Sequence, residues 1–309
     1  MLRIEELSVN FSLRDGRTVK ALRQANLEIQ PGETLALIGE SGSGKSVLGL
    51  ATISLLPPTA RIQGKISFQG NNILKLDETE LLRLRGSQIA FIPQSAGLSL
   101  NPTMKVLKQV EEAAAAPPNN GVHRLALDLL DRLGLEKKKA LCYPHQLSGG
   151  MRQRALAAIG LVAEPKLLIA DEPTKGIDYQ RIKDVESIFL RVKRNNPDLG
   201  ILLVTHDLNF AASMADRVSV MYAGCVVETR QSRDFFNGPQ HPYSRALLEA
   251  APERGLKPIP GQAPGVEEEY DGCPFAPRCQ LATQRCRSDF PTPSPQNEGL
   301  VYCWHYAQA

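Results

Sequence analysis

Apolar and polar positions recur along the chain with two different periods, which predict two kinds of element. Apolar and polar residues alternate over most of 1–11, as they do in a half-buried strand. Further apolar runs of strand length lie at 33–38, 65–69, 89–93, 166–170 and 201–205. Strand-length runs separated by helical stretches are typical of an α/β protein, so we expect an α/β core.

Helical spacing is predicted between these strands. A helix is expected over 45–56, where Pro57 and Pro58 stop it, and another over 179–193. The stretch from about 95 to 160 is rich in Ala and Leu and has helical leucine spacing over 125–133. Beyond about Arg230 the sequence becomes rich in proline and irregular. We therefore predict a large domain over 1–235 with a helical insert at about 95–160, followed by a small extension over 236–309.

Composition and charge narrow the class of protein. The chain has 309 residues, of which 42% are hydrophobic and 22% charged, values typical of a globular protein. The formal net charge of +3 is small and dispersed, which argues against a nucleic-acid partner. No apolar run approaches the length needed to span a bilayer, and the N-terminus lacks the features of a signal peptide. We expect a cytoplasmic protein that reaches a membrane only through partners.

A glycine-rich loop supplies the first candidate chemistry. Residues 39–46 fit the pattern G-x-x-x-x-G-K-[ST], after an apolar strand and before a helix, where a phosphate-binding loop must lie. Its members are Gly39, Glu40, Ser41, Gly42, Ser43, Gly44, Lys45 and Ser46. The backbone N–H groups and the helix N-terminus would bind phosphate oxygens, Lys45 would reach the β- and γ-phosphates, and Ser46 would ligate Mg²⁺. The pattern predicts a site for Mg²⁺ and a nucleoside triphosphate.

Two adjacent carboxylates indicate hydrolysis rather than binding alone. Asp171 and Glu172 follow the apolar residues 167–170. In an enzyme with such a phosphate loop, the first carboxylate holds Mg²⁺ through water and the second polarises the attacking water. We expect ATP hydrolysis, with Glu172 as the general base.

A third motif identifies the family. The sequence LSGGMRQ at 147–153 resembles the LSGGQ signature of ATP-binding-cassette (ABC) ATPases. Ser148 can cap a helix, while Gly149 and Gly150 leave backbone N–H groups accessible to an anion. The resemblance implies a P-loop NTPase (RecA-like) core with an antiparallel β-subdomain and a helical subdomain. It also implies a dimer with a second, homologous ATPase subunit, in which the loop of one subunit and the signature of the other bind each ATP.

Other residues match the family's motifs in order. Gln94 resembles the glutamine that contacts Mg²⁺ and water, Asp178 the aspartate that follows the carboxylates, and His206 the histidine that binds the γ-phosphate. Phe11 is the candidate for stacking on adenine. The residues before Asp178 depart from the family's usual small-Ala-Leu pattern, which raises the possibility of a heterodimer with two unequal ATP sites.

The C-terminal part resembles one branch of the family. GPQHPYSRALL at 238–248 and the cysteine-bearing segment after Gly272 are similar to the oligopeptide/dipeptide/nickel importer ATPases. The resemblance implies two transmembrane permease subunits and an extracytoplasmic binding protein as partners, and a place at the cytoplasmic face of the membrane. Di- or oligopeptides are the expected cargo, with nickel, metallophores or glycans as alternatives.

The terminal cysteines admit several interpretations. They are Cys273, Cys279, Cys286 and Cys303. Disulfides are unexpected in the cytoplasm. A Zn²⁺ site with four thiolates is possible, although the short C-x₂₋₄-C pair common in zinc sites is missing. A [4Fe–4S] cluster takes four thiolates as well and is the expectation that the family resemblance favours. His305 is a spare candidate ligand.

Two other classes of protein were weighed. Soluble ABC ATPases that act on DNA or ribosomes usually carry two cassettes or a long coiled coil, whereas this chain has one signature and no heptad repeat. An interaction module with an inactive site would not need Lys45, Asp171, Glu172 and His206. An importer ATPase remains the prediction.

Overall fold

The computed structural model describes residues 1–13, 15–94, 99–114, 120–175, 179–265, 267–296 and 299–307. The chain folds as two compact units. The first consists of Met1–Ile29, Leu35–Leu74 and His206–Ala309, and the second of Gln30–Thr34 and Lys75–Thr205. The predicted boundary at 235/236 falls inside the first unit.

The first unit contains an antiparallel sheet of order β2-β1-β4-β5. Its strands are β1 (Leu2–Ser12), β2 (Thr18–Ile29), β4 (Ala60–Phe68) and β5 (Asn71–Asn72). The predicted alternation in β1 is confirmed, since Leu2, Ile4, Leu7 and Val9 are buried. A bulge around Glu6, whose φ is 49°, separates Ile4 from Leu7 and keeps both apolar side chains on the buried face.

A second group of strands in this unit is ordered β11-β12-β10-β9-β3. They are β3 (Thr34–Ile38), β9 (Arg217–Tyr222), β10 (Cys225–Gln231), β11 (Pro293–Gln296) and β12 (Gly299–Tyr302). β3 pairs in parallel with β9, and the other pairs are antiparallel. The helices are α1 (Lys45–Thr52), α9 (Leu208–Met214), α10 (Ser232–Asn237), α11 (Pro242–Glu249) and α12 (Gln284–Ser288), with 3₁₀ turns η1 (Ile73–Lys75), η3 (Pro252–Arg254) and η4 (Ala276–Arg278).

The C-terminal extension shares the core of these strands. Ile38 of β3 and Val220 of β9 belong to the same buried cluster as Phe235, Tyr243 and Phe275. The extension is also more ordered than its proline content indicated, because α11, α12, β11 and β12 all lie within it. It is therefore an integral part of the first unit.

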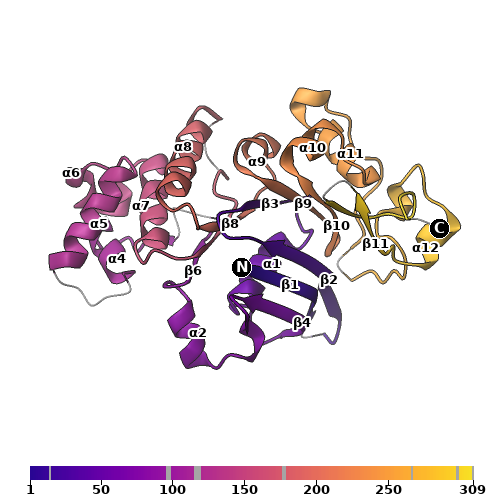
Figure 1. Cartoon of the computed structure of the whole chain (residues 1–309), viewed down its shortest axis with the longest axis horizontal. Coiled ribbons are helices and arrows are strands. Elements are labelled where there is room, and N and C mark those ends of the chain that lie inside the picture. The colour runs from indigo at the N-terminus through magenta and orange to yellow at the C-terminus, as the bar shows by residue number, and fades with distance from the viewer. Residues whose placement is uncertain are drawn as a thin grey trace. The chain divides into compact units, whose positions relative to one another are not determined.

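The second unit contains a parallel sheet of order β8-β7-β6 and a group of helices. Its strands are β6 (Ile89–Ile92), β7 (Leu167–Asp171) and β8 (Gly200–Val204). Its helices are α2 (Glu78–Leu84), α4 (Val106–Glu112), α5 (Asn120–Arg132), α6 (Lys137–Ala140), α7 (Gly149–Leu161) and α8 (Tyr179–Asn195), with the 3₁₀ turn η2 (Pro144–Gln146). Figure 1 shows α4–α7 as one helical group, in which α7 packs against α4, α5 and α8 and also contacts β6. The helices α4–α7 cover most of the stretch of about 95–160 for which a helical insert is predicted.

Among the described residues, no helix combines the length and apolarity that a membrane-spanning helix needs.

Candidate functional site

The glycine-rich loop connects β3 to α1 in the first unit, as the sequence predicts. Lys45 is the first residue of α1 and is only 6% exposed. Its Nζ donates to the carbonyl oxygens of Gly39 at 2.9 Å and Glu40 at 2.8 Å, and lies 3.3 Å from Ser43 Oγ. The ammonium group therefore sits inside the curve of the loop, where it can meet an incoming phosphate.

Two glycines of the loop are required by its surroundings. A Cβ on Gly39 would collide with the Met221 carbonyl oxygen, and a Cβ on Gly44 would lie 2.6 Å from the Ala21 carbonyl oxygen. Both glycines also have positive φ angles, 152° and 103°. The loop thus follows the ends of β2 and β9 closely, while Ser41, Gly42 and Ser46 remain exposed.

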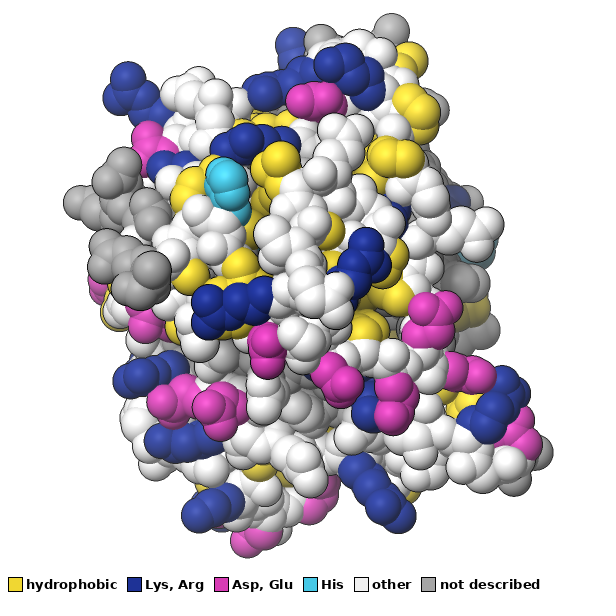
Figure 2. Space-filling model, turned by 90° about the vertical axis from the view of Figure 1, so that its right-hand side faces the viewer, with side chains coloured by type: hydrophobic (Ala, Val, Ile, Leu, Met, Phe, Trp, Pro, Cys, Tyr) yellow, Lys and Arg dark blue, Asp and Glu magenta, His cyan; other side chains and the backbone are white. Residues whose placement is uncertain are grey.

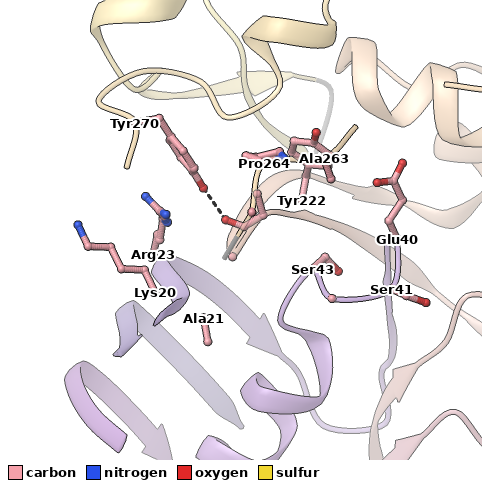
Figure 3. A pocket seen from close by; sticks show the side chains of 14 residues that line it. Lys20, Ala21, Arg23, Glu40, Ser41, Ser43, Tyr222, Ala263, Pro264 and Tyr270 are labelled. Carbon is pink, nitrogen blue, oxygen red and sulfur yellow. Dashed lines mark hydrogen bonds between the residues drawn. The ribbon is translucent and has the colours of Figure 1, made fainter. Parts of the chain in front are cut away.

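A cavity of about 200 Å³ lies beside this loop. Figure 3 shows Glu40, Ser41 and Ser43 on one side, and Lys20, Arg23 and Tyr270 on the other. The Arg23 guanidinium lies 3.9 Å from the centre of the Tyr270 ring, and Tyr270 Oη donates to the Ala223 carbonyl oxygen at 2.6 Å. The cavity is therefore cationic on one side and has the phosphate loop on the other. Phe11 is half-buried in β1 opposite Val19 and is not among the residues that line it.

The candidate histidine lies at the start of the last stretch of the first unit. His206 is exposed and precedes Asp207, whose side chain caps α9 by accepting from the Phe210 N–H at 3.0 Å. The cap fixes the backbone immediately after His206.

The two candidate carboxylates lie at the end of β7 in the second unit. Asp171 is 6% and Glu172 8% exposed. Glu172 has a φ of 50°, an uncommon conformation for a residue with a side chain, and its N–H donates to the Val204 carbonyl oxygen at 2.8 Å. Such left-handed residues cluster at functional sites, because the strain persists only where the surrounding structure fixes it.

Gln94 and the signature motif lie in the same unit as these carboxylates. Gln94 follows β6 and lines a small cavity with Gln153 and Pro173. Gln153, the last residue of the signature motif, donates from Nε2 to the Pro173 carbonyl oxygen at 2.5 Å. Pro173 follows Glu172, so the structure brings Gln94, the signature helix and the carboxylate turn together.

The signature residues form the N-terminus of α7. Ser148 is the N-cap and accepts from the Met151 N–H at 3.4 Å. A Cβ on Gly149 or Gly150 would meet nothing within 4 Å. Ser148 and Gly149 are exposed, so the helix end is accessible to a ligand or partner. Asp178 lies outside the described residues.

The terminal cysteines gather around one cavity of about 220 Å³ in the first unit. Cys273, Cys279, Cys286 and Cys303 all line it, together with His241 and His305. All six cysteines of the chain lie within the described residues and are free thiols. Burial raises the pKa of Cys273 to about 12 and also raises the pKa values of Cys279 and Cys303. Within the described part of the chain, no three His, Cys, Asp or Glu side chains are placed to share a single metal ion.

His241 was missed by the sequence analysis as a residue of this cavity. It is 1% exposed, and its Nδ1 accepts from the Tyr243 N–H at 3.1 Å. Its Nε2 is buried and has no hydrogen-bond partner among the described residues. Nothing in the pattern of residues 238–248 distinguishes this histidine from an ordinary helix cap.

Comparison with known proteins identifies the family. Residues 22–175 match the family model described as ABC transporter, and residues 227–286 match the model described as oligopeptide/dipeptide transporter, C-terminal region. The chain is 40% identical to the oligopeptide transport ATP-binding protein OppD of Escherichia coli, over 93% of this chain and 88% of OppD. It is 37% identical to the dipeptide transport ATP-binding protein DppD of Bacillus subtilis, over 98% and 94% of the two chains.

A solved structure agrees with these matches. The dimeric, post-hydrolysis structure of the ATP-binding cassette MJ0796 with ADP and Pi superposes with a TM-score of 0.66 at 26% identity, covering 75% of this chain and 99% of that one. The chain therefore has the ABC ATPase fold and belongs to the ABC family of transporter subunits. Within this family, it belongs to the oligopeptide/dipeptide branch. The family predicted from the sequence is confirmed.

Proposed function

We propose that this chain is the ATP-hydrolysing subunit of an importer for di- or oligopeptides. The observation that carries the proposal is the intact phosphate loop, with Lys45 held inside it, in a chain whose relatives along nearly its full length are peptide-transport ATP-binding proteins. The loop's N–H groups and Lys45 bind the phosphates of ATP.

The remaining site residues have distinct roles in this proposal. Glu172 accepts a proton from the water that attacks the γ-phosphorus, and His206 donates a hydrogen bond to a γ-phosphate oxygen. Ser46, Asp171 and Gln94 carry the oxygen donors that Mg²⁺ prefers, and Mg²⁺ would neutralise charge on the phosphates. Asp178 acts at the subunit boundary, and Phe11 stacks on adenine.

The exposed signature supports a dimer. Ser148 and Gly149 present a capped helix N-terminus to solvent, where the free N–H groups of the helix can bind an anion. We infer that it completes the ATP site of a second, homologous subunit. Closure of the dimer on two ATP molecules would drive the two permease subunits at the cytoplasmic face of the membrane. A binding protein outside the membrane would deliver the cargo.

The cargo is proposed from the relatives, because this subunit does not contact it. Oligopeptide and dipeptide transport are named for the E. coli and B. subtilis proteins. Nickel, metallophores and glycans remain alternative cargoes. No feature of the described residues favours a soluble ABC ATPase that acts on DNA or ribosomes. A nucleic-acid-binding surface needs clustered Lys and Arg, whereas on the face in Figure 2 these residues lie among Asp and Glu.

We also propose that the four terminal cysteines hold a [4Fe–4S] cluster. The four thiols line one cavity of the described structure. A [4Fe–4S] cluster takes four thiolates, one for each iron, which matches their number. The buried His241 Nε2, which has no hydrogen-bond partner among the described residues, also suits a cluster. Because Nδ1 accepts a hydrogen bond, the neutral ring carries its proton on Nε2. This N–H could donate to a sulfur atom in the cavity. The cluster would supply structural cross-links between distant segments.

Two variants test the ATPase assignment. Glu172→Gln keeps the shape of the side chain but removes the base, so we expect ATP binding to persist while turnover falls about 10²–10⁴-fold. Lys45→Ala should lose nucleotide affinity as well. Turnover by steady-state phosphate release and binding by calorimetry distinguish the two effects. Wild-type turnover in either variant would refute the assignment.

A further inference from the structure

Glu40, the second residue of the phosphate loop, places a carboxylate where an anion is to bind. Its side chain is 28% exposed, so water screens the charge only in part. An unpaired carboxylate here would repel the phosphates of a nucleotide. The C-terminal extension contacts this residue at both its side chain and its backbone.

Arg278 of η4 pairs with the Glu40 side chain. Its Nη1 lies 3.2 Å from Glu40 Oε2 and 3.4 Å from Oε1, and the arginine side chain is only 6% exposed. Nη1 also donates to Tyr222 Oη of β9 at 3.1 Å. The rest of the guanidinium is held by the extension, since Nε donates to the Pro260 carbonyl oxygen at 2.9 Å and Nη2 to the Ile259 carbonyl oxygen at 3.3 Å. The arginine is thus fixed in one position, and its pairing with Glu40 costs little further side-chain entropy.

Tyr243 of α11 holds the Glu40 backbone. The Glu40 N–H donates to Tyr243 Oη at 2.9 Å, and the tyrosine is fully buried. Its ring packs 4.4 Å from that of Tyr222 and 5.4 Å from that of Phe275, measured between centroids. This hydrogen bond directs the Glu40 N–H toward the extension.

We propose that Arg278 and Tyr243 are positioning residues of the phosphate loop, through which the C-terminal extension sets the affinity of the site for nucleotide. The proposal rests on the proposed function, since it assumes that the loop binds nucleotide phosphates. Arg278 neutralises the loop carboxylate, and Tyr243 fixes the backbone that carries it. The ion pair also explains why this chain can carry a glutamate in its phosphate loop: Arg278, beside Cys279, neutralises Glu40.

The charge argument predicts the sign of each substitution. Arg278→Met leaves Glu40 uncompensated and should weaken ADP binding about tenfold, a loss of about 1.4 kcal/mol. Glu40→Gln removes the negative charge and leaves the positive charge of Arg278 in place, so ADP should bind more tightly than it does to the wild type. Glu40→Gln combined with Arg278→Met should recover most of the affinity that Arg278→Met alone loses, because the two sites are directly coupled.

The experiment measures ADP affinity by calorimetry, and KM and kcat for ATP, in the full chain. KM should rise in Arg278→Met while kcat changes less, and Arg278→Lys should restore part of the affinity. Tyr243→Phe, which removes only the hydroxyl, should weaken ADP binding about threefold. Arg233→Met, at an exposed arginine in α10, is the matched control and should leave both constants unchanged.

Equal ADP affinity in wild type, Arg278→Met and Tyr243→Phe would overturn the proposal, as would failure of Glu40→Gln to rescue a folded Arg278→Met protein. If Arg278→Met does not fold, the Arg278→Lys and Tyr243→Phe variants decide, since each retains nearly the native volume. Failure of the wild-type protein to bind ADP at all would instead refute the proposed function.

Discussion

At the scale of single residues, the phosphate-loop pattern specifies a glycine at positions 39 and 44, and the loop has a third glycine, Gly42, between them. The structure separates their roles. Gly39 and Gly44 have backbone atoms of β9 and β2 where a side chain would begin, whereas a Cβ on Gly42 would meet nothing within 4 Å. The local pattern therefore marks the two constrained positions, but the cause of the constraint lies in strands distant in sequence, which only the fold shows.

Gly39→Ala should therefore destabilise the protein more than Gly42→Ala. Both positions have positive φ, 152° at Gly39 and 81° at Gly42, and only the Gly39 side chain would collide with the Met221 carbonyl oxygen. We expect Gly39→Ala to lower the free energy of unfolding by roughly 1–3 kcal/mol beyond Gly42→Ala. Denaturant titration of the two variants measures the difference, and equal midpoints would contradict the close approach.

At the scale of elements, the signature helix α7 has a buried body and an exposed N-terminus. Ser148 caps α7, as its residue type predicts, and the body of the helix is buried from Ala155 to Ala158. Ser148 and Gly149 at its N-terminus, by contrast, are exposed. A buried helix with an accessible, capped N-terminus suits an anion brought by another molecule.

Gly149→Asp tests this directly. The new carboxylate has open space and lies at a helix N-terminus, where a negative charge is favourable, so unfolding stability should be unchanged or slightly higher. If this helix end binds the phosphates of ATP, as proposed, turnover should nevertheless fall at least about a hundredfold, because the carboxylate repels them. Gly149→Ala is the neutral control and should retain more activity. Mixing Gly149→Asp with Lys45→Ala protein should restore part of the turnover if one subunit completes the site of the other; no restoration would argue against sites shared between copies of this chain.

The sequence predicts the buried parallel strands well and the antiparallel strands β2, β9 and β10 poorly. The strands at 33–38, 89–93, 166–170 and 201–205 were recognised because burial on both faces makes them continuously apolar. The sequence does not predict the hairpin β9–β10 or the strand β2. In β10, Glu228 and Arg230 interrupt the apolar pattern, yet both are buried. Glu228 accepts hydrogen bonds from the backbone N–H groups of Gln240 and His241. The helix expected to extend to residue 56 ends at Thr52, where the Ile53 N–H bonds back to Leu50 before the prolines are reached.

At the scale of the whole molecule, the C-terminal extension is joined to the phosphate loop by a shared core. The rings of Tyr222, Tyr243 and Phe275 pack together. In the sequence, Phe275 and Arg278 stand between Cys273 and Cys279, which both line the cysteine cavity. The sequence could identify the cysteines by type and count, but the contacts of Arg278 and Tyr243 with Glu40 span more than 200 residues of chain. Only the fold brings them together.

Loss of the proposed cluster should consequently destabilise the protein and weaken its nucleotide binding. We expect anaerobically prepared protein to contain iron and acid-labile sulfide, and Cys286→Ser to lose them together. Metal binding that occurs only in the native state contributes to folding free energy, so the melting temperature should fall in Cys286→Ser and after chelation. The KM for ATP should rise in the same samples, since η4 carries Arg278 to the loop. The half-buried Cys142, which lies in the second unit, provides the control: Cys142→Ser should keep the iron and the KM. Zinc without iron or sulfide would replace the cluster by a zinc site, whereas metal loss with an unchanged KM would show that the extension holds the phosphate loop without help from the cysteines.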